Sequence, residues 1–388
     1  MSRGRLFGSL CGMVFLVNFA RIVFAPLLSE FIEVFQVGEA TVGIVTTLVW
    51  VGSALTRLPT GWLLTRYPRH RLVLWTGVLL SGAGLFTATA DSIVMLGAGA
   101  ATMGMASGVY FVAANPLVSE LFPARVGRMM GIHGTASQVA AVGAAPLVAV
   151  VTTVLGLEWR AVFVVIGVAS LLVTIALYAT ARRAELPTAG ESDRRLLVAA
   201  RAQWRVIAVG IAILGATGFV WQGLFNFYEL YLVAKGLDPS TARTGLTLAF
   251  AAGIPAFFFS GRIVDRVPRV PYVLGVVAAF AVTVLALTVA EGVVALAALS
   301  LLVGYAIHSL FPALDTYLLA VMPDEHRGSA YAVYSFLMMT IQAMGASVVG
   351  RLVESGLAYD RVFGALAGVL LVVVVGVGLL HRRGLVPT

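Results

Sequence analysis

Arg21 lies inside a long apolar stretch, residues 6–30, one helical turn after Asn18. Its guanidinium group stays charged and presents five N–H donors in a planar fork, which matches a carboxylate or a phosphate. About fifteen helical residues at about 1.5 Å each separate it from the start of the stretch. The pattern predicts a buried anion site, and it leaves open a structural ion pair with Glu229 or another buried acid.

In two other stretches, candidate residues recur at the three- and four-residue spacing of one helix face: Gln222, Asn226 and Glu229 in one, and His308, Phe311 and Asp315 in the other. Proton coupling needs a buried group that changes protonation, so Asp315, Glu229 and His308 are candidate proton carriers. The alternatives are a fixed ion pair for Asp315, contact with outer water for Glu229 and hydrogen-bonded packing for His308.

Three further residues extend the candidate site. Tyr110 and Asn115 lie in the stretch 93–118, and they join Arg21, Asn18, Gln222, Asn226, His308 and Phe311 as candidate substrate contacts. Aromatic rings such as Tyr110 can also clamp an apolar solute, although most aromatic residues pack. Arg57 is a weaker candidate, because a long side chain near a helix end can reach the lipid headgroups.

The surrounding sequence is that of an integral membrane protein. Hydrophobic residues make up 60% of the chain and charged residues 11%, whereas soluble domains average about 25% charged residues. A hydrocarbon core of about 30 Å needs about 20 helical residues. Twelve stretches satisfy this length: 6–30, 41–64, 72–90, 93–118, 129–153, 160–180, 205–231, 242–264, 270–290, 293–319, 328–352 and 360–380.

The basic residues predict the topology. Most of the 26 lysine and arginine residues lie before the first stretch, in every second loop and after the last stretch, which predicts that both termini face the cytosol. The net charge of +8 is then a topology and anionic-lipid signal rather than a sign of nucleic-acid binding. The arginine-rich composition suggests a prokaryotic plasma membrane.

No motif predicts an enzyme or a cofactor. Cys11 is the single cysteine and the histidines are scattered, so no thiolate metal cluster or disulfide is expected. Lys235 is the single lysine, and it does not belong to a phosphate-binding Gly-x-x-x-x-Gly-Lys loop. Any coupling to energy is therefore expected to use an ion gradient.

The chain is an internal duplication. The segments GWLLTRYPR from Gly61 and GRIVDRVPR from Gly261 match at an offset of 200 residues, and Gly104 matches Gly304 at the same offset. Repeats of this kind typically place a solute site between two six-helix bodies. We expect an all-α fold of two pseudo-symmetric bundles, 1–181 and 205–388, joined by a cytosolic linker, 182–204, which is partly an amphipathic helix.

Polar residues are also sorted by helix. The third, sixth, ninth and twelfth stretches lack amide, histidine and charged side chains in their middles and are expected to face lipid. The first, fourth, seventh and tenth contain the candidate residues above and are expected to line a central cavity.

The chain resembles the major facilitator superfamily over essentially its whole length. The loop motif of that family, Gly-x-x-x-Asp-Arg-x-Gly-Arg, is matched by Gly61, Arg66 and Arg69, and again by Gly261, Asp265, Arg266 and Arg269. Thr65 replaces the first acid, and Pro68 and Pro268 replace the second glycine. The resemblance implies alternating access between two bundles.

These motif residues predict a cytosolic gate. A carboxylate such as Asp265 can accept hydrogen bonds at the positive end of a helix, here the expected fifth helix near Arg125 and Arg128. Thr65 offers only a hydroxyl group, so the gate is expected to be asymmetric. The other interpretation is that these loop charges merely set the topology.

Three functions remain open. The first is a proton-coupled transporter of a small organic anion, with Arg21 as the counter-charge. The second is proton-coupled efflux of lipophilic drugs, which is weakened because the fourth helix lacks an arginine and the fifth keeps only Gly143 and Pro146 of the antiporter motif. The third is a non-transporting receptor or lipid scramblase. The resemblance implies that a monomer suffices.

Overall fold

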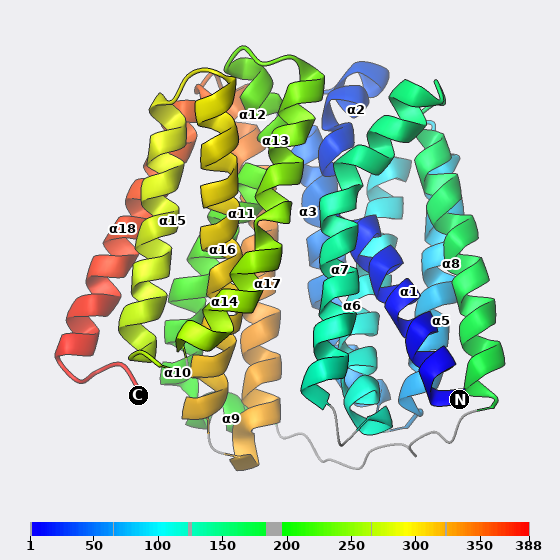
Figure 1. The fold of residues 1–388 in the computed structure, drawn as a ribbon, viewed down its shortest axis with the longest axis horizontal. Coiled ribbons are helices and arrows are strands. Elements are labelled where there is room, and N and C mark those ends of the chain that lie inside the picture. The colour runs from blue at the N-terminus through cyan, green and yellow to red at the C-terminus, as the bar shows by residue number, and fades with distance from the viewer. Residues whose placement is uncertain are drawn as a thin grey trace. The chain divides into compact units, whose positions relative to one another are not determined.

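A computed structural model of the chain describes residues 2–64, 66–122, 126–183, 196–264, 266–322 and 324–387. Within these ranges all regular structure is helical (Figure 1). The chain forms two compact units. Unit 1 comprises Met1–Gln36 and Ile44–Asp193, and unit 2 comprises Val37–Gly43 and Arg194–Thr388.

Eight α-helices precede the middle of the chain, and the third of them begins in unit 2 and continues into unit 1. They are α1 Ser2–Ile22, α2 Leu28–Phe35, α3 Glu39–Leu55, α4 Arg57–Leu63, α5 Arg69–Ala88, α6 Ile93–Leu121, α7 Val126–Ala149 and α8 Arg160–Ala181. A short 3-10 helix, Ala25–Leu27, precedes α2, and a π-helical segment, Val150–Val154, extends α7.

Ten α-helices form the rest of unit 2: α9 Leu196–Ala202, α10 Trp204–Gly210, α11 Ala216–Asn226, α12 Tyr228–Ala234, α13 Pro239–Ala251, α14 Gly253–Val264, α15 Arg269–Val289, α16 Val293–Val321, α17 Asp324–Glu354 and α18 Tyr359–Arg382. A π-helical segment, Ile211–Gly215, joins α10 to α11. Ala199 of α9 is buried, and α9 packs against α17.

Eleven helical spans of the described chain are long and apolar enough to cross a membrane. They correspond to eleven of the twelve predicted stretches. The remaining prediction, 242–264, is divided in the structure between α13, of 13 residues, and α14, of 12 residues. The fold is therefore the all-helical membrane fold that the sequence predicts.

The duplication recurs in the helix bounds. The third and ninth predicted helices begin at Arg69 and Arg269, and the fourth and tenth span Ile93–Leu121 and Val293–Val321, again at an offset of 200 residues. Both helices of the second pair approach a neighbour closely. A side-chain carbon added to Gly104 or Gly304 would collide with the backbone of Val49 or Ala249, respectively.

Four predicted continuous helices are interrupted. The first ends at Ile22 and resumes before Pro26, which has no backbone N–H and starts the new helical segment. The seventh is interrupted at Phe227, where the amide of Asn226 bonds the backbone carbonyl of Gln222 and so competes with the helical ladder. The second and eighth predicted helices are interrupted at Thr56 and Ala252, each three residues before a proline, Pro59 or Pro255.

Exposed apolar side chains gather on the predicted lipid-facing helices. On α8 they include Val165, Leu172 and Ile175, and on α18 they include Val372 and Val375. A soluble protein would bury such side chains, whereas lipid is as apolar as they are. These helices are therefore suited to contact the bilayer.

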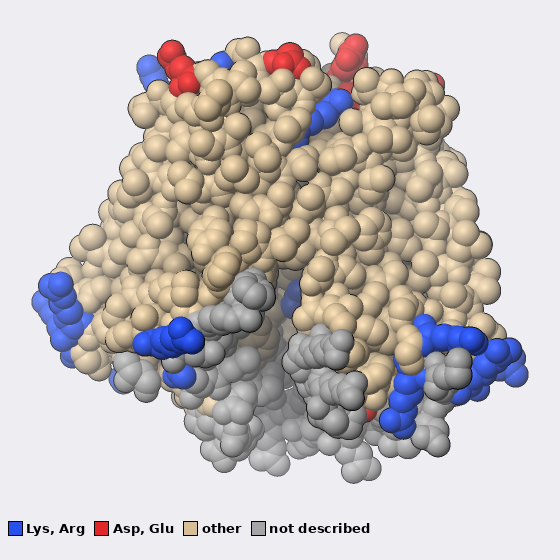
Figure 2. Space-filling model, viewed as in Figure 1, with Lys and Arg blue, Asp and Glu red and all other residues tan. Residues whose placement is uncertain are grey.

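Charge is separated along each unit. Figure 2 shows most lysine and arginine side chains at the end that carries the chain terminus of that unit, and acidic side chains at the opposite end. The surface between these two ends is almost free of charged side chains in this view. This is the distribution expected of a protein that spans a bilayer with its basic ends in the cytosol.

Candidate functional site

Arg21 lies in the last turn of α1, next to the interruption of the helix. The last carbonyl groups of an α-helix carry partial negative charge, so a cation is stabilised there. The sequence predicted a continuous helix through this position. The interruption places Arg21 at the end of a helix rather than in its middle.

Three side chains of unit 1 surround the Arg21 guanidinium. Its Nη2 donates to Oδ1 of Asn18 at 2.6 Å. Its Cζ lies 4.5 Å from the ring centroid of Trp50 and 4.9 Å from that of Phe111. Cation–π contacts of this kind are stronger where water is excluded, and they stabilise the charge without neutralising it.

The Arg21 guanidinium retains donors for a further group. Its Nε is buried and has no hydrogen-bond partner in the described chain. Arg21 also takes part in none of the ion pairs formed within the described ranges. A buried charged donor without a partner is costly, so the arrangement favours an anionic ligand at this place.

Asn18 is held in position from the opposite side. Its Nδ2 donates to the backbone carbonyl of Ser137 on α7 at 2.7 Å, and its side chain is 5% exposed. One amide therefore orients the Arg21 guanidinium and ties α1 to α7. Asn115 on α6 is half-buried.

Tyr110 has packing contacts that the sequence did not predict. Its side chain is completely buried, and its hydroxyl oxygen lies 2.7 Å from the carbonyl oxygen of Leu10 and 2.9 Å from Nε2 of His133. These contacts tie α6 to α1 and α7. Its predicted role as a substrate contact remains a prediction.

The predicted amides of unit 2 bond one another. Nδ2 of Asn226 donates to the backbone carbonyl of Gln222 at 2.7 Å and lies 3.3 Å from Oε1 of the same residue. Both side chains are buried, and both belong to α11. These two residues place hydrogen-bonding groups beside the interruption at Phe227, just as Asn18 lies near the interruption of the first membrane helix after Ile22.

His308 of α16 lies in an aromatic cluster with rings from α11, α13 and α16. Its Nδ1 lies 2.7 Å from the carbonyl oxygen of Gly304, and its ring contacts Trp221, Phe250 and Phe311. Nδ1 therefore donates this hydrogen bond in the neutral tautomer, and Nε2 is the acceptor. This is the hydrogen-bonded packing environment that the sequence left open for His308. The side chain of Asp315 lies outside the described residues.

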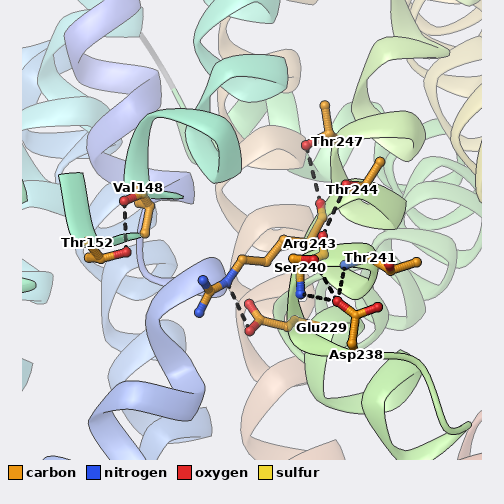
Figure 3. Close-up of polar contacts among 9 residues, drawn as sticks. All are labelled: Val148, Thr152, Glu229, Asp238, Ser240, Thr241, Arg243, Thr244 and Thr247. Atoms are coloured by element: carbon orange, nitrogen blue, oxygen red, sulfur yellow. Dashed lines mark hydrogen bonds and ion pairs between the residues drawn. The ribbon is translucent and has the colours of Figure 1, made fainter. Parts of the chain in front are cut away.

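Glu229 forms an ion pair that the sequence did not predict. Its Oε1 lies 3.1 Å from Nε of Arg243 on α13, and Figure 3 shows the two side chains pointing toward one another. The Glu229 side chain is 2% exposed and that of Arg243 is 20% exposed. A buried carboxylate is tolerated when such a partner and further hydrogen bonds offset its desolvation.

Asp238 caps α13 directly before its first residue, Pro239, near this pair. Its Oδ1 accepts hydrogen bonds from the Ser240 hydroxyl at 2.6 Å and from the backbone N–H groups of Ser240 and Thr241, each at 3.1 Å (Figure 3). The Ser240 side-chain bond, followed by those from Thr241, lowers the pKa of the Asp238 carboxyl below its usual value. The cap fixes the first turn of the helix that carries Arg243.

The predicted cytosolic gate is described in part. Arg69 Nη1 forms an ion pair with Glu120 Oε1 at 3.0 Å, which ties the start of α5 to the end of α6. Arg66 lies over the ring of Trp62 at 4.1 Å, and Gly61 belongs to α4. Arg266 and Arg269 are exposed, and Gly261 belongs to α14. Asp265, Thr65 and the side chain of Arg128 lie outside the described residues.

Sequence reasoning missed Trp50, Ser137, His133 and Arg243. Only Arg243 carried a signal, because it is a charge inside the predicted stretch 242–264. Trp50 contacts Arg21, and Ser137 contacts Asn18, from helices far away in the sequence, so no local pattern marks them.

The family model of the Major Facilitator Superfamily matches residues 10–294 and 236–386. The chain belongs to this superfamily. The resemblance proposed from the loop motif is thereby confirmed, and with it a transport function and the absence of an enzymatic role.

Among curated relatives, a "Probable sugar efflux transporter" of Mannheimia succiniciproducens is 23% identical over 365 residues, covering 92% of this chain and 90% of the relative. A protein of the same description from Helicobacter acinonychis is 26% identical and covers 66% of this chain and 64% of the relative. An uncharacterised MFS-type transporter of Bacillus subtilis, YwfA, is 24% identical, and the match covers 87% of this chain and 82% of that protein.

Solved structures of superfamily transporters share the fold. A bacterial homologue of the human lysosomal transporter Spinster, in an inward-facing and occupied conformation, has a TM-score of 0.80 at 17% identity, and the match covers 97% of this chain and 96% of that one. A POT family transporter in complex with a thioalcohol-conjugated peptide has a TM-score of 0.78 at 11% identity, with coverage of 97% and 96%.

Proposed function

We propose that this superfamily member is a secondary transporter that moves a small organic anion by alternating access, coupled to protons. The single observation that carries the proposal is the Arg21 guanidinium, which has a buried Nε without a partner and no ion pair within the described chain. Intramembrane charges almost always find a partner. The solute is the partner proposed for this one.

The contacts of Arg21 favour a carboxylate-bearing or phosphate-bearing solute. Asn18 occupies one of the five N–H donors, so the remaining donors can bind two oxygen atoms of one planar group. Trp50 and Phe111 supply apolar surface beside the charge. A solute with an anionic head and a compact apolar or hydroxylated body fits these surroundings.

The predicted structural alternative gains no support within the described residues. Glu229, the acid suggested as a partner for Arg21, forms its ion pair with Arg243. A carboxylate that already pairs with one cation gives little further stabilisation when it pairs with a second cation. Arg21 therefore remains the candidate for solute binding.

The Glu229–Arg243 pair is the proposed site of proton coupling. Protonation of Glu229 removes its negative charge and leaves Arg243 without its counter-charge. The Nη groups of Arg243 form no hydrogen bond or ion pair in the part of the chain that the structure describes. A proton would thus release a second guanidinium group to interact with an anion, which links proton uptake to anion movement. Asp315 remains a predicted second carrier.

The proposed setting is a prokaryotic plasma membrane, with a monomer as the transporting unit and both termini in the cytosol. The separation of charge along each unit (Figure 2) supports this orientation through the positive-inside rule. The exposed apolar side chains of α8 and α18 support contact with lipid.

A neutral sugar is the second candidate solute, because two curated relatives are described as probable sugar efflux transporters. The Gln222 and Asn226 amides and the nearby ring of Trp221 are groups that bind sugar hydroxyls and ring faces. A neutral sugar, however, leaves the Arg21 charge without a counter-ion.

Flux into proteoliposomes under an imposed pH gradient tests the proposal. The panel contains small carboxylates, sugar acids, sugar phosphates, neutral sugars and a cationic dye. The variants are Arg21→Lys, which keeps the charge and loses the fork, and Arg21→Gln, which loses both. Arg205→Lys is the matched control, because Arg205 is exposed and lies over the ring of Trp204 at 5.6 Å.

We expect saturable anion flux in the parent and in Arg205→Lys, a decrease of about tenfold in Arg21→Lys and loss of flux in Arg21→Gln. A tenfold change corresponds to about 1.4 kcal/mol of binding. Flux of neutral sugars that is insensitive to Arg21 would favour the sugar candidate. Extrusion of the dye alone would favour drug efflux, and lipid flip-flop without solute flux would favour a scramblase.

A further inference from the structure

The first turn of α3 is held by a carboxylate from α17. Oε2 of Glu354, the last residue of α17, accepts a hydrogen bond from the backbone N–H of Ala40 at 3.0 Å. Ala40 is the second residue of α3. The first N–H groups of a helix have no partner within the helix, and a negative charge there is favourable.

Glycine residues allow this contact to be close. A side-chain carbon at Gly38 would meet the Glu354 carboxylate, and one at Gly350 would meet the backbone of Glu39. One turn further along, a side-chain carbon at Gly43 would lie 2.7 Å from the carbonyl oxygen of Ala346. Gly43 and Gly350 therefore need glycine for α3 and α17 to approach as they do, whereas at Gly38 the flexible Glu354 side chain could move aside.

The contact places the start of α3 in unit 2. Val37–Gly43 belongs to unit 2 by its contacts, although the chain on both sides of this segment belongs to unit 1. The Ser347 hydroxyl lies 3.4 Å from the carbonyl oxygen of Gly43 and adds a weak bond. The helix α3 therefore begins in one unit and continues into the other.

The chain order puts this contact at the outer side of the membrane. With the amino terminus in the cytosol, the first membrane crossing ends near Phe35 at the outer side, and α3 starts there. The helix α17 crosses outward from Asp324 and ends at Glu354. The contact joins the outer ends of the second and eleventh membrane helices.

We propose that Glu354 and the glycines Gly38, Gly43 and Gly350 form an outer latch that must release the first turn of α3 when the transporter opens to the outside. This inference rests on the alternating access of the proposed function. The latch uses the chemistry that the sequence predicted for the cytosolic gate, a carboxylate on the amino end of a helix. The chain places it at the opposite side of the membrane.

The strength of the contact suits a latch. The Glu354 side chain is exposed, so water competes for the carboxylate and screens its charge. A charge at a helix end shifts an equilibrium by about twofold to fivefold under these conditions. Backbone contact at the glycines adds shape complementarity without side chains that must be repacked. The first turn of α3 can therefore detach and rebind at each cycle.

Spin-label distance measurements test the latch in the full chain. Cys11→Ser removes the single native cysteine, and Asp91→Cys and Glu291→Cys place labels on exposed loops of units 1 and 2. The latch variants are Glu354→Gln, Glu354→Ala and Gly350→Val. The control is Glu33→Gln, because Glu33 is an exposed acid of α2.

We expect Glu354→Ala to raise the population with the longer outer distance by about twofold to fivefold. Glu354→Gln keeps a hydrogen-bond acceptor and loses the charge, so its effect is expected to be smaller. Gly350→Val, whose side chain would occupy the place of the Glu39 backbone, is expected to have the largest effect. Glu33→Gln is expected to match the parent.

Distances identical to the parent in both Glu354→Ala and Gly350→Val would overturn the latch. A lower melting temperature with unchanged distances would also overturn it, because the contact would then be merely structural. The distances are recorded without solute, so they do not depend on which solute Arg21 binds. If the flux assay contradicts the anion proposal, the distance measurements still test the latch. If the distances contradict the latch, the flux assay still tests the anion proposal.

Discussion

The two units contain the same structural feature with opposite electrostatics. In unit 1 the first membrane helix is interrupted after Ile22, beside Arg21, whose guanidinium contacts an amide and two aromatic rings. In unit 2 the seventh membrane helix is interrupted at Phe227, and just after this interruption the buried Glu229 pairs with Arg243. Among the described residues, the cation of unit 1 has no carboxylate partner, whereas that of unit 2 pairs with Glu229.

This difference suggests how a duplicated fold can bind an anion with one unit and respond to a proton with the other. An interrupted helix exposes backbone groups and allows polar side chains inside a membrane protein. A cation without an internal partner is suited to bind an anion that arrives and leaves. A cation paired with an acid is suited to respond to a proton, because protonation of the acid changes the charge of the pair.

The strongest test supplies Arg21 with the partner that Arg243 already has. In Asn18→Asp a carboxylate replaces the amide whose Oδ1 lies 2.6 Å from Arg21 Nη2. The new ion pair competes with the solute, so the Michaelis constant for anion flux is expected to rise by about tenfold to a hundredfold, or about 1.4 to 2.8 kcal/mol. Concentration-dependent flux in proteoliposomes measures it.

Asn18→Ala is the control for this prediction. It removes the hydrogen bond that Asn18 accepts from Arg21 and the one that it donates to the Ser137 carbonyl, without adding a charge, so it is expected to raise the Michaelis constant less than the aspartate does. Equal effects of the two substitutions would show that the amide, and not the missing counter-charge, is what matters at this site.

The second test removes the cation from the pair in unit 2. Arg243→Gln leaves the Glu229 carboxylate, 2% exposed, without its cationic partner. Breaking a buried ion pair in this way costs about 3 to 5 kcal/mol, so we expect a clear loss of thermal stability in detergent. Arg243→Gln combined with Glu229→Gln is expected to recover most of that loss.

A double-mutant cycle on these variants separates pairing from packing. Additive losses would contradict a coupled pair. Proton uptake linked to solute flux in Glu229→Gln then tests the coupling role. Coupling at the parent level would remove Glu229 from the proposal and leave Asp315 as the candidate.

The helices away from the interruptions could be predicted from the sequence. The stretch 72–90 corresponds to Arg69–Ala88, and 93–118 corresponds to Ile93–Leu121, because an apolar run of membrane length has few alternatives to a helix. The interruption at Phe227 could not be predicted, since the composition stays apolar through it and its cause is a local hydrogen bond. The other three interruptions lie near Pro26, Pro59 and Pro255, but a proline in a membrane helix does not by itself determine an interruption.

The candidate site was predictable to a smaller extent. The type and depth of Arg21 pointed to an anion, since both follow from the sequence alone. Its contacts with Trp50 and Phe111 depend on how helices far apart in the sequence pack, and no periodicity encodes that. For the same reason the partner of Glu229 could not be predicted, because Arg243 lies fourteen positions away on another helix.

The third test asks whether the two units share one packing scheme. Gly104→Ala and Gly304→Ala each add a carbon that would collide with the backbone of a neighbouring helix. Overpacking of this kind costs about 1 to 3 kcal/mol, and we expect similar losses of thermal stability in the two variants. Gly364→Ala is the control, because no atom lies within 4 Å of the added carbon. A loss in only one unit would limit the duplication to sequence.

The smallest expected effect concerns how α3 and α13 begin. The first turn of α3 is capped by Glu354 from another helix, whereas α13 is capped by its own Asp238. Asp238→Asn keeps an acceptor and loses the charge at the helix end, so we expect a small decrease in melting temperature. Hydrogen bonds lower the folded-state pKa of Asp238, the Ser240 bond being the largest cause.

This pKa shift sets the sign of the pH dependence. A lowered carboxyl pKa stabilises the fold above the unfolded-state value of about 3.9, and the stabilisation is lost as the pH falls through the folded-state pKa. The difference in melting temperature between parent and Asp238→Asn is therefore expected to be constant from about pH 5 to 8 and to shrink below about pH 4. A difference that grows on acidification would contradict the cap, because only a raised pKa gives that sign.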